Sequence, residues 1–258
     1  AKGYAYWHSD SVAVLSSLMD SVGDFGMSFI AIIALRAALR PADREHRHGH
    51  GKIEGVSALF QAAFLSAAAV FLIFESVSAF IKPQPVRHHL LAGLVVLLSM
   101  GGAVSIAFVQ RQAARRAKSL VMEADSAHYL SDAGIAAAVL AAITADYYGV
   151  PHWIGPLASG VVAAYMLFTA RSVGSAALDM LLDKELPQSM RDHIIETALS
   201  HDHVRGLHDL RTHRSGVRQM ISFDMELDGH LGFREAHDIA RQVELELIAI
   251  FPNADIFI

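Results

Sequence analysis

Residues 11–39 read SVAVLSSLMDSVGDFGMSFIAIIALRAAL, and this stretch indicates the class of protein. It is apolar and long enough to cross a membrane as a helix, yet it carries Asp20 and Asp24 near its middle. A spacing of four places both carboxylates on one helix face. Because charge at the bilayer centre is costly, such residues are usually functional. The stretch therefore predicts a membrane helix that handles an ion or a proton.

The composition agrees with a membrane protein. The chain has 258 residues, of which 53% are hydrophobic, and a formal net charge of −5. Long apolar runs alternate with short basic segments, and charge becomes frequent only in the last third. The absence of cysteine excludes disulfides and thiolate metal sites. We expect an integral membrane protein with a soluble domain, and no nucleic-acid partner.

Basic residues predict the orientation of five spans, at about 11–39, 56–81, 89–109, 120–148 and 153–175. Lys and Arg gather in the segments that follow the first and third spans: Arg40, Arg44, Arg47 and Lys52, then Arg111, Arg115, Arg116 and Lys118. By the positive-inside rule both segments are cytoplasmic, and so is the chain after Ser175.

In the remainder of the chain, the periodicity of the hydrophobic residues changes. LPQSMRDHIIETALSH and GFREAHDIARQVELELIAIF read as amphipathic helices, whereas GLHDLRTHRSG, VRQMISFDMEL and ADIFI read as strands. The order αββαβ predicts a two-layer α+β domain with both helices on one face of the sheet.

A second pair of membrane residues, His128 and Asp132, also has a spacing of four. Counting ten residues from Asp10 to Asp20 and from Lys118 to His128 puts both pairs about 15 Å inside the membrane. Three carboxylates and one imidazole at one depth can form a tetrahedral zinc site. Acids that are simply protonated or hydrogen-bonded to a neighbouring helix, or a proton relay without metal, are the alternatives.

LMDSVGDF, HGHGKIE, EADSAHYLSD and HDLRTHRSG resemble motifs of the cation diffusion facilitator (CDF) family, in particular its bacterial zinc transporters of the YiiP/FieF type. The resemblance implies a six-span CDF fold with a metallochaperone-like cytoplasmic domain, working as a homodimer in the cell inner membrane. It places the transmembrane domain at 1–182 and the cytoplasmic metal-binding domain at 183–258. It also implies that the first family span is largely missing from this sequence.

The resemblance implies three metal sites and one ion pair. The transport site would be Asp20, Asp24, His128 and Asp132; the loop site Asp43, His46 and His50; the cytoplasmic-domain site His208, Asp224 and His237; and the interface salt bridge Lys52 with Asp183. Asp224 replaces a histidine of better-known relatives, and further ligands would lie beyond Ile258.

Other histidines carry weaker indications. His48 is an additional candidate ligand in the loop, which without the resemblance reads equally well as a solvated His-rich segment. Five histidines have no counterpart in the family motifs and are expected to lie on the surface: His193, His201, His203, His213 and His230.

These observations predict a zinc exporter that works by proton antiport and alternating access, with zinc both transported and regulatory. An exporter of iron, cadmium or manganese and a membrane-anchored metal sensor are the alternatives. An intramembrane protease is disfavoured because the sequence has no HExxH motif, so no enzymatic activity is expected.

Overall fold

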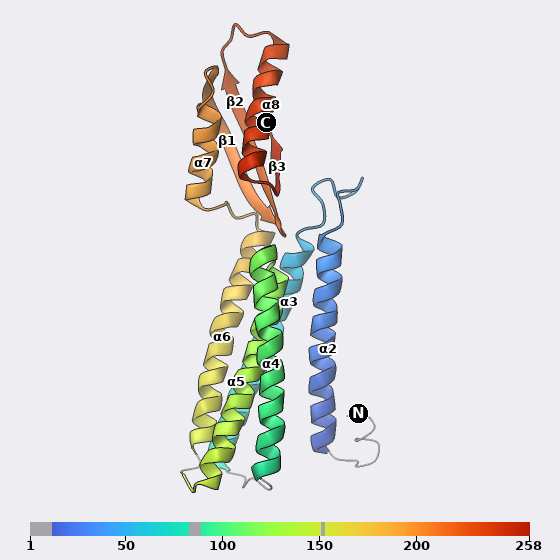
Figure 1. Ribbon diagram of the computed structural model, residues 1–258, viewed down its shortest axis with the longest axis vertical. Helices are drawn as coiled ribbons and strands as arrows, with labels where there is room; N and C mark the ends of the chain where they lie inside the picture. Colours follow the sequence, from blue (N-terminus) through green and yellow to red (C-terminus); the bar gives the residue numbers. More distant parts are fainter. Residues whose placement is uncertain (1–11, 83–88, 151–152) are drawn as a thin grey trace.

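The computed structural model describes the backbone of residues 12–82, 89–150 and 153–258; the side chains of residues 12–22, 24 and 89–92 lie outside the description. It contains five long helices: α2 (Val12–Ala38), α3 (Ile53–Ile81), α4 (His89–Ala117), α5 (Leu120–Tyr147) and α6 (Ile154–Leu181). They run along the long axis of the molecule, and a small α+β domain stands at one end (Figure 1).

Four of these helices are long and apolar enough to cross a membrane: α3, the Gly93–Ala117 part of α4, α5 and α6. Twenty-eight residues of helix, as in α5, extend for about 42 Å, which exceeds the roughly 30 Å hydrocarbon core. In α2 the described apolar part is Phe25–Ala38. Large side chains such as Phe71, Leu98 and Phe168 are more than three-fifths exposed, as expected for surfaces that face lipid.

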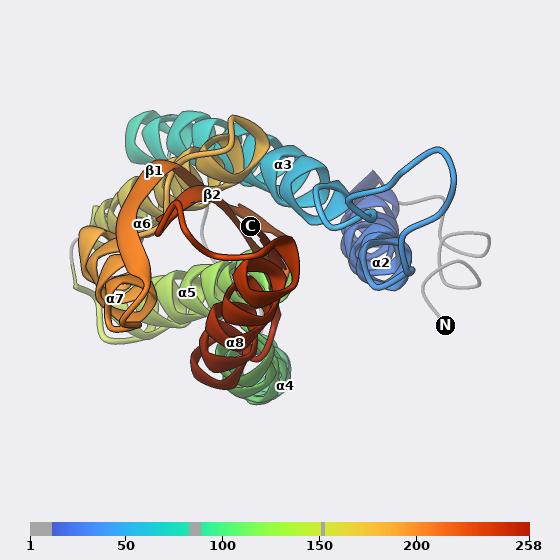
Figure 2. The same cartoon turned by 90° about the horizontal axis from the view of Figure 1, so that it is seen from above.

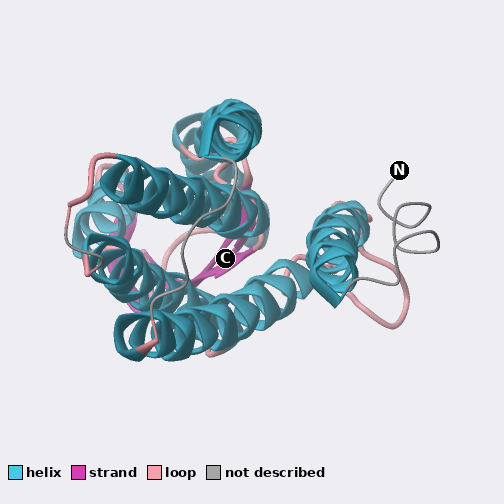
Figure 3. Ribbon diagram, turned by 90° about the horizontal axis from the view of Figure 1, so that it is seen from below, coloured by secondary structure: helices cyan, strands magenta, loops and turns pink. Residues whose placement is uncertain are grey.

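The helices pack mainly in two pairs, α3 with α6 and α4 with α5, whereas α2 contacts α3 and α5. Seen along the long axis, α2 stands beside one end of α3 and apart from α4 and α6 (Figure 2 and Figure 3). Small residues make the α3–α6 pairing close, because Ala58, Ala62, Ala170 and Ala177 are all buried there.

Two of the predicted spans end several residues before the observed helices do. The third span was expected to end near residue 109, but α4 continues to Ala117, so Arg115 and Arg116 occupy its last turn rather than a loop. Cations are favourable at the carboxyl end of a helix, which explains the extension. The fifth span was expected to end near residue 175, but α6 continues to Leu181 because Ala177 and Met180 pack in the core.

The carboxyl-terminal domain has the predicted order αββαβ: α7 (Gln188–Leu199), β1 (Val204–Ser215), β2 (Arg218–Leu227), α8 (Phe233–Ile250) and β3 (Ala254–Phe257). The sheet order is β1-β2-β3, with β1 antiparallel and β3 parallel to β2. One core joins the helices to one face of the sheet, through Ile194, Ala198, Ile221, Phe223, Val243, Leu247 and Phe251. The predicted fold class, membrane helices followed by a two-layer α+β domain, is confirmed.

The β1–β2 hairpin reaches the membrane helices with its turn. A Cβ atom on Gly51, just before α3, would lie 2.2 Å from the backbone oxygen of Ser215, so only glycine permits this approach. Arg214 donates a hydrogen bond from Nη2 to the backbone oxygen of Lys118, between α4 and α5, at 2.8 Å. The small domain is therefore joined directly to the ends of the helices.

Candidate metal centres

His128 and Asp132 lie one turn apart on α5, with 3.7 Å between His128 Nε2 and Asp132 Oδ2. His128 is buried, whereas the side chain of Asp132 is one-third exposed. The His128 ring packs edge-on against Phe64 of α3, with 6.0 Å between ring centroids, and lies 5.7 Å from the ring of Tyr129. An imidazole and a carboxylate thus share one face of a helix, with the imidazole packed between aromatic rings.

Asp20 and Asp24 lie on α2, and their side chains are outside the described part of the structure. The backbone around them is placed by two contacts. A Cβ atom on Gly23 would meet Phe64, the same ring that contacts His128, at 3.7 Å. One turn beyond Asp24, Ser28 Oγ lies 3.0 Å from the hydroxyl of Tyr129 on α5. The α2 segment that bears the aspartates therefore runs level with the α5 segment that bears His128.

Asp125 is a further acid on this face that the sequence analysis did not single out. It is 5% exposed and accepts a hydrogen bond on Oδ2 from Gln110 Nε2 of α4 at 2.5 Å. Its position three residues before His128, and seven before Asp132, is the spacing of one helix face, so periodicity could have identified it. It extends the polar face toward the basic ends of the helices.

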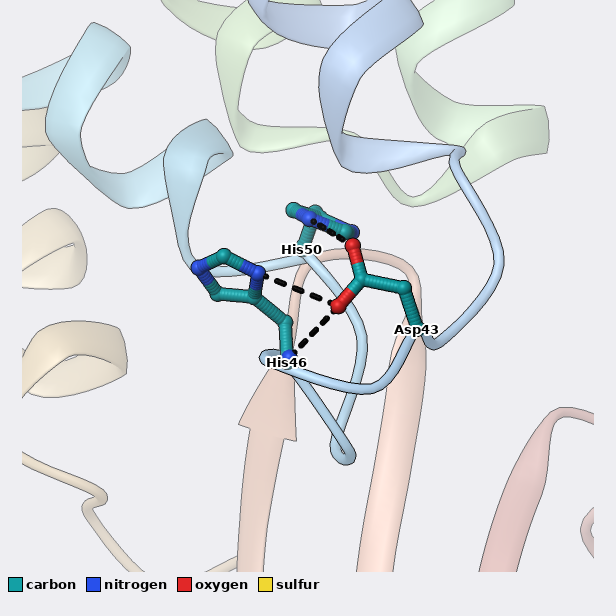
Figure 4. A group of neighbouring side chains, drawn as sticks. All are labelled: Asp43, His46 and His50. Atoms are coloured by element: carbon teal, nitrogen blue, oxygen red, sulfur yellow. Dashed lines mark hydrogen bonds and ion pairs between the residues drawn. The ribbon is translucent and has the colours of Figure 1, made fainter.

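Asp43, His46 and His50 form the second centre, in the loop between α2 and α3 (Figure 4). His46 Nδ1 lies 3.3 Å from Asp43 Oδ1, and His50 Nε2 lies 3.3 Å from Asp43 Oδ2. The ligand atoms of all three residues fall within 4.8 Å of one another. Figure 4 shows both imidazoles directed at the one carboxylate.

Backbone hydrogen bonds in the loop hold the Asp43 carboxylate in place. The backbone amides of His46 and Glu45 donate to Asp43 Oδ1 at 2.6 and 2.9 Å. The amide of His46, more than any other group, lowers the pKa of Asp43, so this carboxylate stays deprotonated and able to bind a cation. Gly49 has φ +77°, which lets the chain turn back and bring His50 to the site. His50 Nδ1 is buried and has no hydrogen-bond partner among the described residues.

His48 does not join this group. Its ring centroid lies 6.1 Å from that of Phe257 in β3, so the side chain contacts the small domain.

The cytoplasmic-domain candidates are distributed over the two faces of the sheet. His208 and Asp224 are directly opposite each other on β1 and β2, and His208 Nε2 lies 2.8 Å from Glu226 Oε1. Ile221 and Phe223 face the helices, so Asp224 points to the other face, whereas His237 lies on α8. These three side chains, all in the described part of the chain, do not form a group within coordinating distance.

Lys52 and Asp183 connect the start of α3 to the segment after α6. Lys52 Nζ donates to Asp183 Oδ2 at 2.8 Å, and both side chains are nearly half exposed. The other carboxylate oxygen of Asp183 lies 3.5 Å from His213 Nε2 of β1. Asp183 therefore stands between the membrane helices and the sheet.

Glu54 is a second acid that the sequence analysis missed. It is 1% exposed in the first turn of α3, and it accepts hydrogen bonds from Ser119 Oγ and from the backbone amide of Val121 at 3.3 Å. It thereby satisfies donors at the amino end of α5. No local sequence pattern could predict that Glu54 is buried, because its partner segment is more than 60 residues away.

Comparison with known proteins identifies the family. Residues 1–182 match the family model of the cation efflux transmembrane domain, and residues 186–258 match that of the cation efflux protein cytoplasmic domain. The chain is similar to the cation-efflux pump FieF of Cronobacter sakazakii (35% identical), Yersinia enterocolitica (37%) and Klebsiella pneumoniae (34%). Each alignment has 257 residues and covers 100% of this chain and 85% of the relative. With two family models matched in this order, the chain belongs to the cation efflux, or cation diffusion facilitator, family of membrane transporters and is not an enzyme.

Proposed function

We propose that this transporter exports zinc in exchange for protons, and that Asp20, Asp24, His128 and Asp132 bind the zinc during transport. The observation that carries the proposal is the His128–Asp132 pair, which lies on one face of α5 with the imidazole buried against the ring of Phe64. Intramembrane ionisable residues are costly and are retained where they serve transport. The contacts of Phe64 and Tyr129 bring the aspartate-bearing segment of α2 to the same level.

The donor set favours zinc. Three carboxylates and one imidazole suit a four-coordinate zinc ion, and the imidazole nitrogen discriminates against ions that prefer oxygen alone. Iron, cadmium and manganese are the alternative cargoes, since carboxylates bind all of them.

Proton exchange follows from the cost of an empty site. Without a metal, three carboxylates near the bilayer centre would carry uncompensated charge, at about 3 kcal/mol each or more. The lone pairs that bind zinc also bind protons, so protons can neutralise the site for its return. Alternating access requires two bodies that move relative to each other, and the pairing of α3 with α6 and α4 with α5 offers that division.

The loop centre and the small domain would regulate this cycle from the cytoplasmic side of the inner membrane. Asp43, His46 and His50 present a partly preformed site with a buried imidazole nitrogen that lacks a partner among the described residues. We place the boundary between the membrane domain, 1–182, and the cytoplasmic domain, 183–258, directly after α6.

The cytoplasmic domain is proposed to form a homodimer. His208 and Asp224 are neighbours on one face of the sheet, whereas His237 lies on α8, so one zinc ion would not bind all three within a protomer. In the proposed dimer, a second protomer would supply ligands to complete the site. The name of the family model that matches residues 186–258 refers to a dimer, which supports this arrangement.

The proposal is tested by zinc uptake into sealed vesicles that contain the full chain. With a proton gradient imposed across the membrane, zinc should move against the proton flow, and collapsing the gradient should slow it. Parallel measurements with iron(II), cadmium and manganese rank the cargoes. Zinc binding without flux of any of the four metals would overturn the proposal in favour of a membrane-anchored sensor.

A further inference from the structure

A further group of metal-ligating side chains lies at the opposite end of the small domain from the β1–β2 turn. It consists of His203, just before β1, Asp228, just after β2, and His230, in the turn that leads to α8. The ligand atoms of the three residues lie within 4.8 Å of one another. The loop between β2 and α8 stands at the end of the molecule farthest from the membrane helices (Figure 1).

The backbone fixes the positions of these residues. Val204 and Leu227 are paired across β1 and β2, and immediately beyond them the amide of Asp228 donates to the backbone oxygen of His203 at 3.2 Å. The amide of Leu231 then donates to the oxygen of Asp228 at 3.2 Å, which closes the turn that carries His230. Two ligands are therefore set by the sheet and the third by a hydrogen-bonded turn.

The side chains converge and remain accessible. His203 Nδ1 lies 3.2 Å from Asp228 Oδ2, and the rings of His203 and His230 are 6.3 Å apart. The His203 side chain is 49% exposed and that of Asp228 is 14% exposed. An ion can thus approach the imidazoles from solvent, while the carboxylate lies beneath them.

Arg205 binds the Asp228 carboxylate but does not occupy all of its lone pairs. Its Nε donates to Asp228 Oδ1 at 2.5 Å and its Nη2 to Oδ2 at 3.0 Å. Together with His203, this bond lowers the pKa of Asp228 to about 2, so the group is ionised at neutral pH. A carboxylate offers about four lone-pair positions, which leaves room for a metal ion beside the guanidinium.

We propose that His203, Asp228 and His230 form a zinc site on the cytoplasmic domain. It shares no residue with the transport site, the loop site or the group of His208, Asp224 and His237. Two imidazoles and one carboxylate leave one tetrahedral position for water, and they favour zinc over magnesium or calcium. An ion-pair network would explain why Arg205 and His203 contact Asp228. It does not require the imidazole of His230 to lie at coordinating distance as well. The site is independent of the proposed transport function, because it lies away from the membrane helices.

The site is tested by chemical labelling of histidines in the full-length chain, with and without zinc. Diethyl pyrocarbonate modifies accessible unliganded imidazoles, and mass spectrometry assigns the modification to each residue. Zinc should reduce labelling of His203 and His230 several-fold and in parallel. His193 is the matched internal control, since its side chain is 53% exposed and lies 3.9 Å from Glu196. Unchanged labelling of His203 and His230, at a zinc concentration that protects other histidines of the chain, would overturn the proposal.

Zinc stoichiometry gives a second, independent test. The variant His203→Ala/His230→Ala should bind one zinc fewer per protomer than the parent chain. The control variant His193→Ala/His201→Ala, which removes two imidazoles from the same domain, should lose none. Equal zinc content in all three proteins would contradict the site. Neither measurement depends on zinc flux, so failure of this site and failure of the transport proposal are distinguishable.

Discussion

His128 and Asp132 on α5, and Asp43, His46 and His50 in the loop before α3, offer the same ligand atoms, but the protein supports them differently. In the loop, backbone amides hold the carboxylate and the side chains of Asp43 and His46 are about half exposed. On α5, helical spacing places the two side chains one turn apart, and His128 is buried against Phe64.

The two centres should therefore behave differently when no metal is bound. Water can solvate the loop ligands when no metal is bound, so vacancy there costs little. In the proposed transport site, uncompensated carboxylates near the bilayer centre would be costly, and the proposed uptake of protons would neutralise them. A solvated centre can therefore regulate, whereas a buried one is suited to couple two fluxes.

The largest expected effect is at the membrane centre. Asp24→Ala and His128→Ala should each lower zinc flux by at least about 100-fold, because even groups that only support metal ligands are worth 10–100-fold. The measurement is zinc uptake into vesicles at matched protein content. His48→Ala is the control, since that ring contacts Phe257 instead of the loop centre, and it should transport normally. Normal flux in either membrane variant would remove that residue from the transport site.

The loop centre should show the opposite behaviour. His46→Ala/His50→Ala should lose one bound zinc per protomer and keep most of the flux, because the ligands lie outside the bilayer. Backbone amides keep Asp43 deprotonated in the variant as in the parent, so the loss of zinc should reflect the missing imidazoles. Zinc content and uptake are measured on the same preparation. If flux disappears while the other zinc ions stay bound, the comparison between the two centres fails.

A smaller effect is expected where the loop meets the small domain. Gly51→Ala forces a Cβ atom to within 2.2 Å of the Ser215 backbone oxygen, and such overpacking costs about 1–3 kcal/mol. Thermal unfolding of the detergent-solubilised chain should show the loss. Gly101→Ala is the matched control, because its Cβ would meet nothing within 4 Å. Equal unfolding temperatures for the two variants would show that the hairpin turn is not held against Gly51.

The smallest effect is expected for the ion pair between Lys52 and Asp183. Both side chains are nearly half exposed, so their coupling should be below about 1 kcal/mol and should weaken with salt. A double-mutant cycle with Lys52→Ala and Asp183→Asn measures the coupling; asparagine suits the φ of +55° at position 183. The control is Lys184→Ala, which breaks the ion pair between Lys184 and Asp179 and leaves Lys52 and Asp183 in place. A coupling of several kcal/mol would indicate that the pair is shielded from solvent in the assembled protein.

Sequence reasoning was most successful where a local pattern has one structural meaning. Apolar runs predicted the long helices, and the switch from period 3.6 to period 2 predicted the order αββαβ. The ends of α4 and α6 were wrong, because hydropathy marks the lipid-facing part of a helix while capping and packing decide where it stops.

Long-range contacts were beyond a single sequence. Glu54 reads as an ordinary acidic residue in the first turn of a helix. Its burial depends on Ser119, which lies between α4 and α5. His203 and His230 were expected to be surface residues, and they are exposed; their proximity to Asp228 arises only when β1 and β2 pair. Asp125 was within reach of helical periodicity, but its partner Gln110 on α4 was not.

The central claim, that protons and zinc compete for one intramembrane site, is tested most directly by the pH dependence of zinc uptake. The parent chain and His128→Asp are compared in vesicles at several internal and external pH values. In the parent, zinc affinity should fall as the pH is lowered, because a protonated imidazole has no lone pair for the metal. In His128→Asp the dependence should move toward carboxylate values and selectivity against cadmium and manganese should weaken. Identical pH profiles in the two proteins would contradict the account.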